Sequence, residues 1–237
     1  MSDKTRIIIK LSGEALANGN HQAINPERVR AIAQEVKDAY DLGTFEIGII
    51  VGGGNIWRGK DAESMGMERS SADYMGMIAT ILNALALQNA IEELGIETRT
   101  MTSLNIPQVA EPYIRRKAIS NFEKDRVVIF GGGTGNPYFS TDTTSALRAA
   151  ELGVKRILMA KNGTDGVYDK DPRKHKDAVR YTELTHQEVL ELGLGVMDST
   201  ASALCKDNDI EIIVFDMNKP GNIRRAAAGE AVGTRIY

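Results

Sequence analysis

Short runs of apolar, β-branched residues recur along the chain, and longer segments with helical spacing of apolar positions separate them. The runs occupy residues 6–11, 46–51, 126–130, 156–159 and 211–215, with a weaker one at 97–102. Each run is apolar in its middle and does not alternate with polar residues, which is typical of strands buried on both faces of a parallel sheet. The pattern therefore predicts five strands and a weaker sixth.

Helical patterns lie at residues 26–42, 71–94, 141–152 and 199–207. The first is the clearest, because Asn25 can cap it, Pro26 suits its first turn and Gly43 suits its end. Strands that alternate with helices predict an open, mostly parallel sheet with helices on both faces, which is an α/β fold. The polar, turn-rich segment 162–176 is the best candidate for a boundary between two lobes of one continuous sheet.

Length, charge and cysteine content exclude several classes of protein. The 237 residues fit one large α/β domain or two small ones. The net charge of -3 does not indicate general binding to nucleic acid. The single cysteine, Cys205, excludes an internal disulfide and suits a reducing cytoplasm. The N-terminal apolar run stops at Lys10, and no run of about 18 apolar residues follows, so we expect neither secretion nor a membrane span.

Three of the predicted strands run directly into glycine-rich loops, at residues 9–13, 50–55 and 129–136. Ligands of open α/β sheets bind outside the carboxyl ends of the strands, where these loops should gather. Glycine lets backbone N–H groups approach phosphate oxygens, and the helix N-termini that follow add a positive dipole. Any one glycine could simply make a tight turn, but three such loops together favour a phosphate site.

Two known glycine fingerprints do not fit these loops. A dinucleotide-binding loop needs a third glycine where Trp57 follows Gly52 and Gly54. Residues 54–60 come close to a P-loop, but Asp61 follows where that motif has a hydroxyl residue. The sequence therefore argues against NAD and against a P-loop.

Charged side chains beside the loops are candidates for the chemistry. Lys10 ends a strand of isoleucines next to a Ser-Gly turn, which favours a phosphate clamp over a snorkelling lysine. Arg58 could hold phosphate with its planar fork, or be an ordinary surface arginine. Asp73, Asp142 and Asp198 each stand near a predicted helix start, where simple capping is the alternative. The histidines show no metal-ligand spacing, so we expect no transition metal held by the protein alone. In-line phosphoryl transfer needs positioning, cations and Mg²⁺ instead.

Six motifs, taken together, resemble the amino acid kinase family and, within it, the bacterial kinases that act on UMP. They are KLSGEAL at 10–16, GGGNIWRG at 52–59, ADYMGM at 72–77, GTGNPYFSTD at 133–142, DGVYDKDP at 165–172 and VMDSTA at 196–201. The resemblance runs from about residue 10 to residue 233 in unchanged order. It implies transfer of the γ-phosphate of ATP to UMP, which gives UDP for pyrimidine nucleotide biosynthesis.

The resemblance also implies an architecture and partners. The fold would be a three-layer α/β/α sandwich, one domain with an acceptor-binding lobe at about 1–155 and an ATP-binding lobe at about 156–237. Mg²⁺ would enter with ATP, GTP could activate and UTP could inhibit. We expect a cytoplasmic homohexamer with no nucleic-acid or membrane partner. The apolar segment 71–94 could form part of a subunit interface, although from the sequence a fully buried central helix explains it equally well.

Site residues carry over from the resemblance where the motifs match. The catalytic residues would be Lys10, Arg58, Asp142 and Asp198. The ATP-binding residues would be Lys10, Leu11, Ser12, Gly13, Gly54, Arg58, Asn162, Tyr168 and Asp171. The UMP-binding residues would be Gly53, Asp73, Thr134, Gly135, Asn136, Pro137, Tyr138, Phe139, Ser140 and Thr141. Asp73 would hold the ribose hydroxyls, while Asp142 and Asp198 would orient Lys10 and the cations.

One segment departs from the family pattern, and two other functions stay open. In the family, the loop associated with GTP activation is often richer in glycine, whereas this chain reads NGNHQ at residues 18–22. By the resemblance, the effector segment would be Asn18, Gly19, Asn20, His21, Gln22 and Ala23. A kinase that forms an acyl phosphate would favour a second lysine in the 196–201 motif, where Asp198 stands and Lys161 is the only nearby candidate. A non-catalytic nucleotide-binding protein would be expected to lack Lys10 or Arg58, and both are present.

Overall fold

The computed structural model describes residues 4–17, 19 and 22–237. Its strands are β1 (Thr5–Leu11), β2 (Phe45–Val51), β3 (Thr98–Thr102), β4 (Glu111–Pro112), β5 (Val127–Gly131), β6 (Arg156–Lys161), β7 (Glu183–Leu184), β8 (Glu211–Asp216) and β9 (Thr234–Ile236). Its helices are η1 (Gly13–Leu16, a 3₁₀ turn), α1 (Pro26–Tyr40), α2 (Gly59–Ser64), α3 (Arg69–Glu93), α4 (Arg115–Phe122), α5 (Thr141–Leu152), α6 (His186–Glu191), α7 (Ser199–Asp207) and α8 (Asn222–Ala227).

All nine strands form one sheet, in the order β4-β3-β5-β2-β1-β6-β8-β9-β7. Neighbouring strands are parallel, except that β9 runs antiparallel to β8. β1 lies between β2 and β6, so Lys10 is in register with Ile50 on one side and Met159 on the other. The predicted mostly parallel sheet is confirmed, and the catalytic candidate Lys10 stands on an inner strand.

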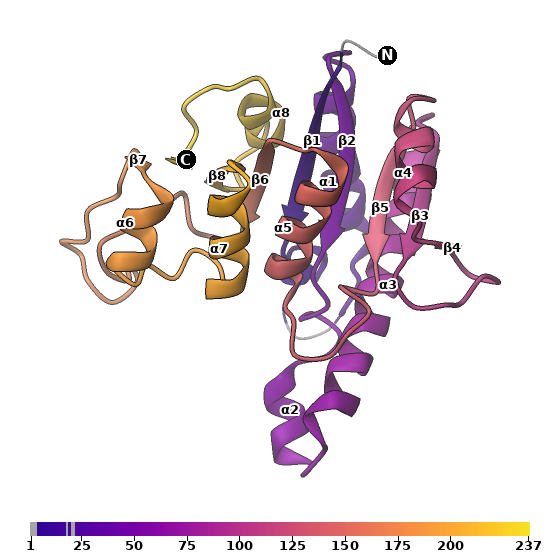
Figure 1. Ribbon diagram of the computed structural model, residues 1–237, viewed down its shortest axis with the longest axis horizontal. Coiled ribbons are helices and arrows are strands. Elements are labelled where there is room, and N and C mark those ends of the chain that lie inside the picture. The colour runs from indigo at the N-terminus through magenta and orange to yellow at the C-terminus, as the bar shows by residue number, and fades with distance from the viewer. Residues whose placement is uncertain (1–3, 18, 20–21) are drawn as a thin grey trace.

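Two apolar cores, one on each face of the sheet, make the molecule a three-layer sandwich. Helices α1, α3 and α8 pack on one face, and α4, α5 and α7 pack on the other. Figure 1 shows α2 and the start of α3 extending beyond the carboxyl ends of the central strands. The predicted α/β/α architecture is therefore confirmed, and the glycine-rich loops lie at the edge where α2 projects.

Capping residues account for where the helices begin. The Asn25 side chain accepts the backbone N–H of Arg28 at 3.0 Å, as predicted for α1. Ser140 caps α5 by accepting the backbone N–H groups of Asp142 and Thr143. Asp198 caps α7. α5 and α7 have the predicted bounds because a hydroxyl or carboxylate stands directly before each apolar pattern.

Helix α3 is the one helix in the described part of the chain that is long and apolar enough to cross a membrane. Half of its most apolar window is buried inside the protein, and it packs against α1, β3 and β5. A core helix of this kind passes the same test of length and composition as a membrane span. Its remaining apolar side chains form an exposed stripe of Tyr74, Met75, Ile78 and Leu82.

Candidate active site

Lys10 lies at the carboxyl end of β1 and is 8% exposed. Its ammonium Nζ lies 2.5 Å from Oδ1 of Asp142, in the first turn of α5. Because Ser140 caps α5, the capping alternative for Asp142 is wrong, and its carboxylate is available as a counter-ion. A buried ammonium beside a carboxylate is fixed in place and keeps two further N–H donors to offer an anion.

Asp198 lies beside this ion pair at the start of α7 and accepts hydrogen bonds from three donors. Its carboxylate accepts the hydroxyl of Ser140, the hydroxyl of Thr143 at 2.9 Å and the backbone N–H of Ala201 at 2.9 Å. Burial alone would raise the pKa of Asp198, but these hydrogen bonds hold the pKa below its ordinary value. Asp198 therefore caps α7, which was the alternative role considered for it. The same carboxylate also connects the start of α5 to the start of α7 through its bonds to Ser140 and Thr143.

Two of the glycine-rich loops are packed against each other behind Lys10. A Cβ at Gly13 would lie 2.5 Å from Oδ1 of Asn55 and closer still to the carbonyl oxygen of Gly52. The fully buried Asn83 of α3 donates to the Gly52 carbonyl at 2.7 Å and to Asn55 Oδ1 at 2.7 Å, and Asn55 returns a bond to Asn83 Oδ1 at 3.0 Å. Asn55 also donates to the carbonyl of Ala23 at 2.6 Å. Glycine at position 13 is thus required for the approach of the two loops.

A cavity of about 160 Å³ opens between the second glycine loop, the start of α3 and the segment before α5. Five of the predicted UMP-binding residues line it, together with Gly54: Gly53, Asp73, Phe139, Ser140 and Thr141. The other predicted residues of this group belong to the adjoining loop but not to the lining: Thr134, Gly135, Asn136, Pro137 and Tyr138. We refer to this space as the acceptor cavity.

Asp73 closes one side of the acceptor cavity by bridging α3 and the loop before α5. Its Oδ2 accepts the backbone N–H of Tyr138 at 2.7 Å and lies 3.7 Å from Nε of Arg69. Arg69 in turn stacks over the Tyr138 ring, 4.7 Å from the centroid. Glu68 is the residue before α3, and Asp73 lies further into the helix. The capping alternative for Asp73 is therefore wrong.

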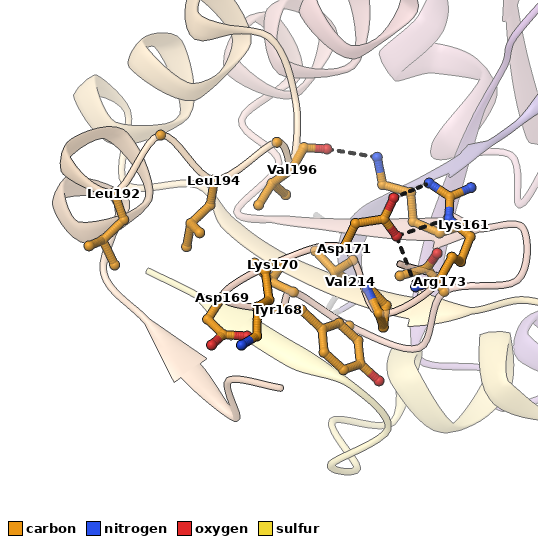
Figure 2. Close-up of a pocket in the computed structure, with 16 residues that line it drawn as sticks. Lys161, Tyr168, Asp169, Lys170, Asp171, Arg173, Leu192, Leu194, Val196 and Val214 are labelled. Atoms are coloured by element: carbon orange, nitrogen blue, oxygen red, sulfur yellow. Dashed lines mark hydrogen bonds and ion pairs between the residues drawn. The ribbon is translucent and has the colours of Figure 1, made fainter. Parts of the chain in front are cut away.

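A second cavity, of about 500 Å³, opens at the carboxyl end of β6, the strand next to that of Lys10. Its walls are the loop after β6, including Tyr168 and Asp171, and the segment from Leu192 to Val196 (Figure 2). The Tyr168 hydroxyl donates to Asp165 at 2.6 Å, and Asp171 pairs with Arg173 at 3.1 Å. We refer to this space as the donor cavity, because it holds Tyr168 and Asp171, two of the residues predicted to bind ATP.

Two further predicted residues, Asn162 and Arg58, lie at a third opening. Asn162 and Arg58 line it together with Glu14, Gly19 and Asn55. Arg58 is exposed, and it is held by Glu14 Oε1 at 2.7 Å and by the Gly54 carbonyl at 3.0 Å. The structure thus places Asn162 beside Arg58 and outside the lining of the donor cavity.

The predicted effector segment is only partly described. Asn18, Asn20 and His21 lie outside the described residues. Gly19 borders the opening at Arg58, and Gln22 accepts a hydrogen bond from Asn25 at 2.7 Å. The bond from Asn55 to Ala23 connects the end of this segment to the second glycine loop.

The comparison with known families agrees with this geometry. The model of the amino acid kinase family matches residues 5–216. The chain belongs to the amino acid kinase family. A uridylate kinase of Pediococcus pentosaceus is 56% identical to it over 231 residues, which cover 98% of this chain and 95% of that protein.

Two solved structures of UMP kinases are similar to this chain. The crystal structure of UMP kinase from Ureaplasma parvum has a TM-score of 0.94 and 39% identity and covers 98% of both chains. The crystal structure of UMP kinase from Bacillus anthracis has a TM-score of 0.95 and 42% identity and covers 98% of this chain and 95% of that chain. The whole fold of this chain, and not only its motifs, is therefore similar to theirs.

Several residues of the site were not predicted from the sequence. Trp57 lines the acceptor cavity and donates from its indole nitrogen to the Ala72 carbonyl at 2.9 Å, although an aromatic side chain is unusual in a phosphate loop. Met77 also lines that cavity. The helical spacing from Asp73 to Met77 was the available signal, since residues four apart share one face of a helix.

Within the described residues, no group of three or more His, Cys, Asp or Glu side chains is placed to hold a metal ion. The two carboxylates at the centre, Asp142 and Asp198, are oxygen donors of the type that Mg²⁺ accepts when substrate phosphates and water complete its shell. The residues present thus fit a cation that arrives with a nucleotide.

Proposed function

We propose that this chain transfers the γ-phosphate of ATP to UMP and releases ADP and UDP. The observation that carries the proposal is that Lys10, paired with Asp142, stands on β1 between β2, whose following loop lines the acceptor cavity, and β6, whose last residue lines the donor cavity. Phosphoryl transfer requires the attacking and leaving oxygens to lie roughly in line across one transferring group. A cation fixed on the strand between these two is suited to that group.

Each residue of the centre has a role that follows from its surroundings. Lys10 would bind the transferring phosphoryl group, and Asp142 would hold the ammonium in place. Asp142 and Asp198 would face the Mg²⁺ that accompanies ATP, which would neutralise part of the phosphate charge. Backbone N–H groups of the glycine loops would bind the phosphate oxygens, because such fixed donors need no reorganisation during the reaction.

Arg58 would reach the phosphates from the exposed side. It is bound to Glu14 by an ion pair whose two side chains are 60% and 48% exposed. An exposed pair of this kind is worth at most about 1 kcal/mol, so a phosphate would displace Glu14 readily. The planar fork of Arg58 could then bind two phosphate oxygens at once.

The two cavities support the proposed division into lobes. The residues that line the acceptor cavity all precede residue 142, within the lobe at about 1–155. Those that line the donor cavity run from Lys161 to Val214, within the lobe at about 156–237. UMP would therefore be bound by the first lobe and the adenosine of ATP by the second, with Lys10 reaching across from the first.

A panel of phosphate acceptors tests this function. ADP release would be measured with UMP, CMP, dTMP, carbamate and acetylglutamate at fixed ATP and Mg²⁺. We expect UMP to give the highest kcat/KM. Faster turnover of carbamate or acetylglutamate would instead identify a kinase that forms acyl phosphates, and ATP binding without turnover of any acceptor would identify a nucleotide-binding protein.

We further propose that the chain assembles as a homohexamer and that α3 takes part in its subunit contacts. The exposed stripe of α3 supports this, since Ile78 and Leu82 are 52% and 48% exposed. A second copy that covered this stripe would remove apolar surface from water at about 25 cal/mol per Å². Light scattering of Ile78→Glu beside the wild type tests the contact, and a wild-type monomer at micromolar concentration would exclude it.

Regulation and location complete the proposal. GTP would activate through the segment from Asn18 to Ala23, and the bond from Asn55 to Ala23 gives that segment a physical link to the second glycine loop. UTP would inhibit by placing its uridine in the acceptor cavity. The enzyme would act in the cytoplasm, where the free, buried Cys205 stays reduced.

A further inference from the structure

Lys161 is a second lysine at the carboxyl edge of the sheet, on the strand next to Lys10. Lys10 is in register with Met159, and Lys161 is two residues further along β6. Side chains two apart on a strand share a face and lie about 6.6 Å apart. Ile8 and Met159 both belong to the core on the side of α5 and α7. Lys10 and Lys161 therefore project from the same face of the sheet, towards the helix that carries Asp142.

The Lys161 ammonium has one hydrogen-bond acceptor in the described part of the chain, the carbonyl of Val196 at 2.7 Å. Within those residues no carboxylate forms an ion pair with it, in contrast to Lys10. Burial lowers the pKa of Lys161, the nearby Asp142 carboxylate opposes that effect and the Lys10 charge adds to it. Lys161 thus has two free N–H donors, and it lies close enough to the catalytic pair to be affected by both charges.

The donor cavity is the space that these free donors face. Lys161 is part of its lining, and Figure 2 shows the bond from its ammonium to Val196 at one end and the Tyr168 ring at the other. A nucleotide whose base lies near Tyr168 and whose terminal phosphate reaches Lys10 must lead its phosphate chain past the Lys161 end. An ammonium at that end would meet the phosphates that are not transferred.

We propose that Lys161 binds the α- and β-phosphates of ATP, as a second cation that enters from β6 while Lys10 enters from β1. The inference rests on the proposed function, because it assumes that ATP occupies the donor cavity. Phosphate oxygens carry negative charge, so they attract the Lys161 ammonium more strongly than the neutral carbonyl of Val196 does. The contact stabilises ATP before transfer and the β-phosphate of ADP afterwards.

The competing explanation is that Lys161 only anchors the segment from Leu192 to Val196. That segment forms one wall of the donor cavity. An anchor would affect every ligand of the cavity equally, whereas a phosphate contact would affect only ligands that carry phosphates. Adenosine and ATP therefore separate the two explanations.

Two variants of Lys161 separate the loss of its charge from the loss of its bond to Val196. Lys161→Met removes the charge and the bond to Val196, while Lys161→Gln removes the charge and keeps an N–H donor for the Val196 carbonyl. Lys155→Met is the matched control, because Lys155 stands before the other end of β6 and also donates to a backbone carbonyl, that of Asn208 at 2.9 Å. Melting temperatures are recorded for all of them.

Calorimetry then measures the binding of ATP, ADP and adenosine in the presence of Mg²⁺ and without UMP. For Lys161→Gln we expect about ten- to a hundredfold weaker binding of ATP and ADP, unchanged binding of adenosine, and no change in Lys155→Met. Equal weakening of ATP and adenosine, or unchanged ATP binding in both Lys161 variants, would overturn the contact. The contact would also be overturned if wild-type protein bound ATP no more tightly than adenosine. Wild-type protein that binds no ATP at all would overturn the proposed function along with it.

Discussion

Removing the Asp73 carboxylate should weaken UMP binding and leave ATP binding intact. Asp73→Ala deletes the acceptor of the Tyr138 backbone N–H, the 2.7 Å bond that joins α3 to the loop before α5. Tyr138 has a φ of 72°, in the left-handed region that a tyrosine adopts only when its surroundings hold it there. The Asp73 carboxylate therefore helps to hold the conformation of the loop that borders the acceptor cavity.

The magnitude follows from the kind of bond and from its exposure. Hydrogen bonds to a charged group contribute about 1.5–3 kcal/mol when shielded from water. The Asp73 side chain is 30% exposed, so solvent screening reduces the expected loss to about 1–2 kcal/mol. That free energy corresponds to about a five- to thirtyfold rise in the KM for UMP. Because Asp73 does not touch the reacting atoms, binding is lost equally in ground and transition states, and kcat should change little.

Steady-state kinetics with each substrate varied in turn, beside melting curves, provides the assay. Asp73→Asn should give the smaller defect, since its amide oxygen can still accept the Tyr138 N–H. Asp41→Ala is the control, an exposed aspartate that pairs with Lys37 on α1 at 2.7 Å. An unchanged KM for UMP in a well-folded Asp73→Ala protein would refute the role of Asp73. A rise in the KM for ATP of the same size would show that the change spreads beyond the acceptor cavity.

Three further perturbations address the catalytic lysine, the packing of the loops and the buried thiol. Lys10→Met should stay folded, with a melting temperature lowered by the unpaired Asp142 carboxylate, and should lose about 2.7–4 kcal/mol of transition-state stabilisation, read as a hundred- to thousandfold fall in kcat in the ADP-release assay. Gly13→Ala should lower the free energy of unfolding by about 1–3 kcal/mol in urea titration, because its Cβ would overlap the Gly52 carbonyl, whereas Gly59→Ala, with nothing within 4 Å, should not. Burial raises the pKa of the Cys205 thiol from 9.0 to about 12. Its contribution to stability is therefore complete below pH 9 and is lost as pH rises towards 12, by about 1.4 kcal/mol at pH 10. The alkaline loss of stability should be smaller by that amount in Cys205→Ala, and identical pH profiles would contradict it.

Most of the sheet could be predicted from the sequence because its strands are long, apolar and separated by capped helices. The C-terminal strand β9 could not, since Thr234–Ile236 is only three residues long. It is stabilised by pairing with β8 on one side and with the edge strand β7 on the other, not by a pattern of its own. Strand β4, which is two residues long, could not be predicted for the same reason. Tertiary pairing decides such short strands, and local propensity carries little information about it.

The residues of the candidate site were easier to identify than their partners. Asp142 was recognised as a carboxylate at a helix start, yet the capping that this position suggested is done by Ser140. Its pairing with Lys10 joins residues far apart in the chain. Asp73 was assigned to ribose, but nothing in the sequence indicated its bond to the Tyr138 backbone. Contacts that depend on the approach of two loops require the fold, because periodicity reports only which face of an element is buried.

Helix α3 makes a different structural contribution on almost every side, and this limits how its sequence can change. Its inner face holds Asn83 against the second glycine loop, its first turns hold Asp73 against the acceptor loop, and its outer side presents Ile78 and Leu82. An ordinary surface helix keeps a polar face on which substitutions are nearly neutral. α3 has little of such a face, so we expect sequence drift in this enzyme to collect on exposed positions of α1 such as Arg30 and Gln34 and to leave α3 comparatively fixed.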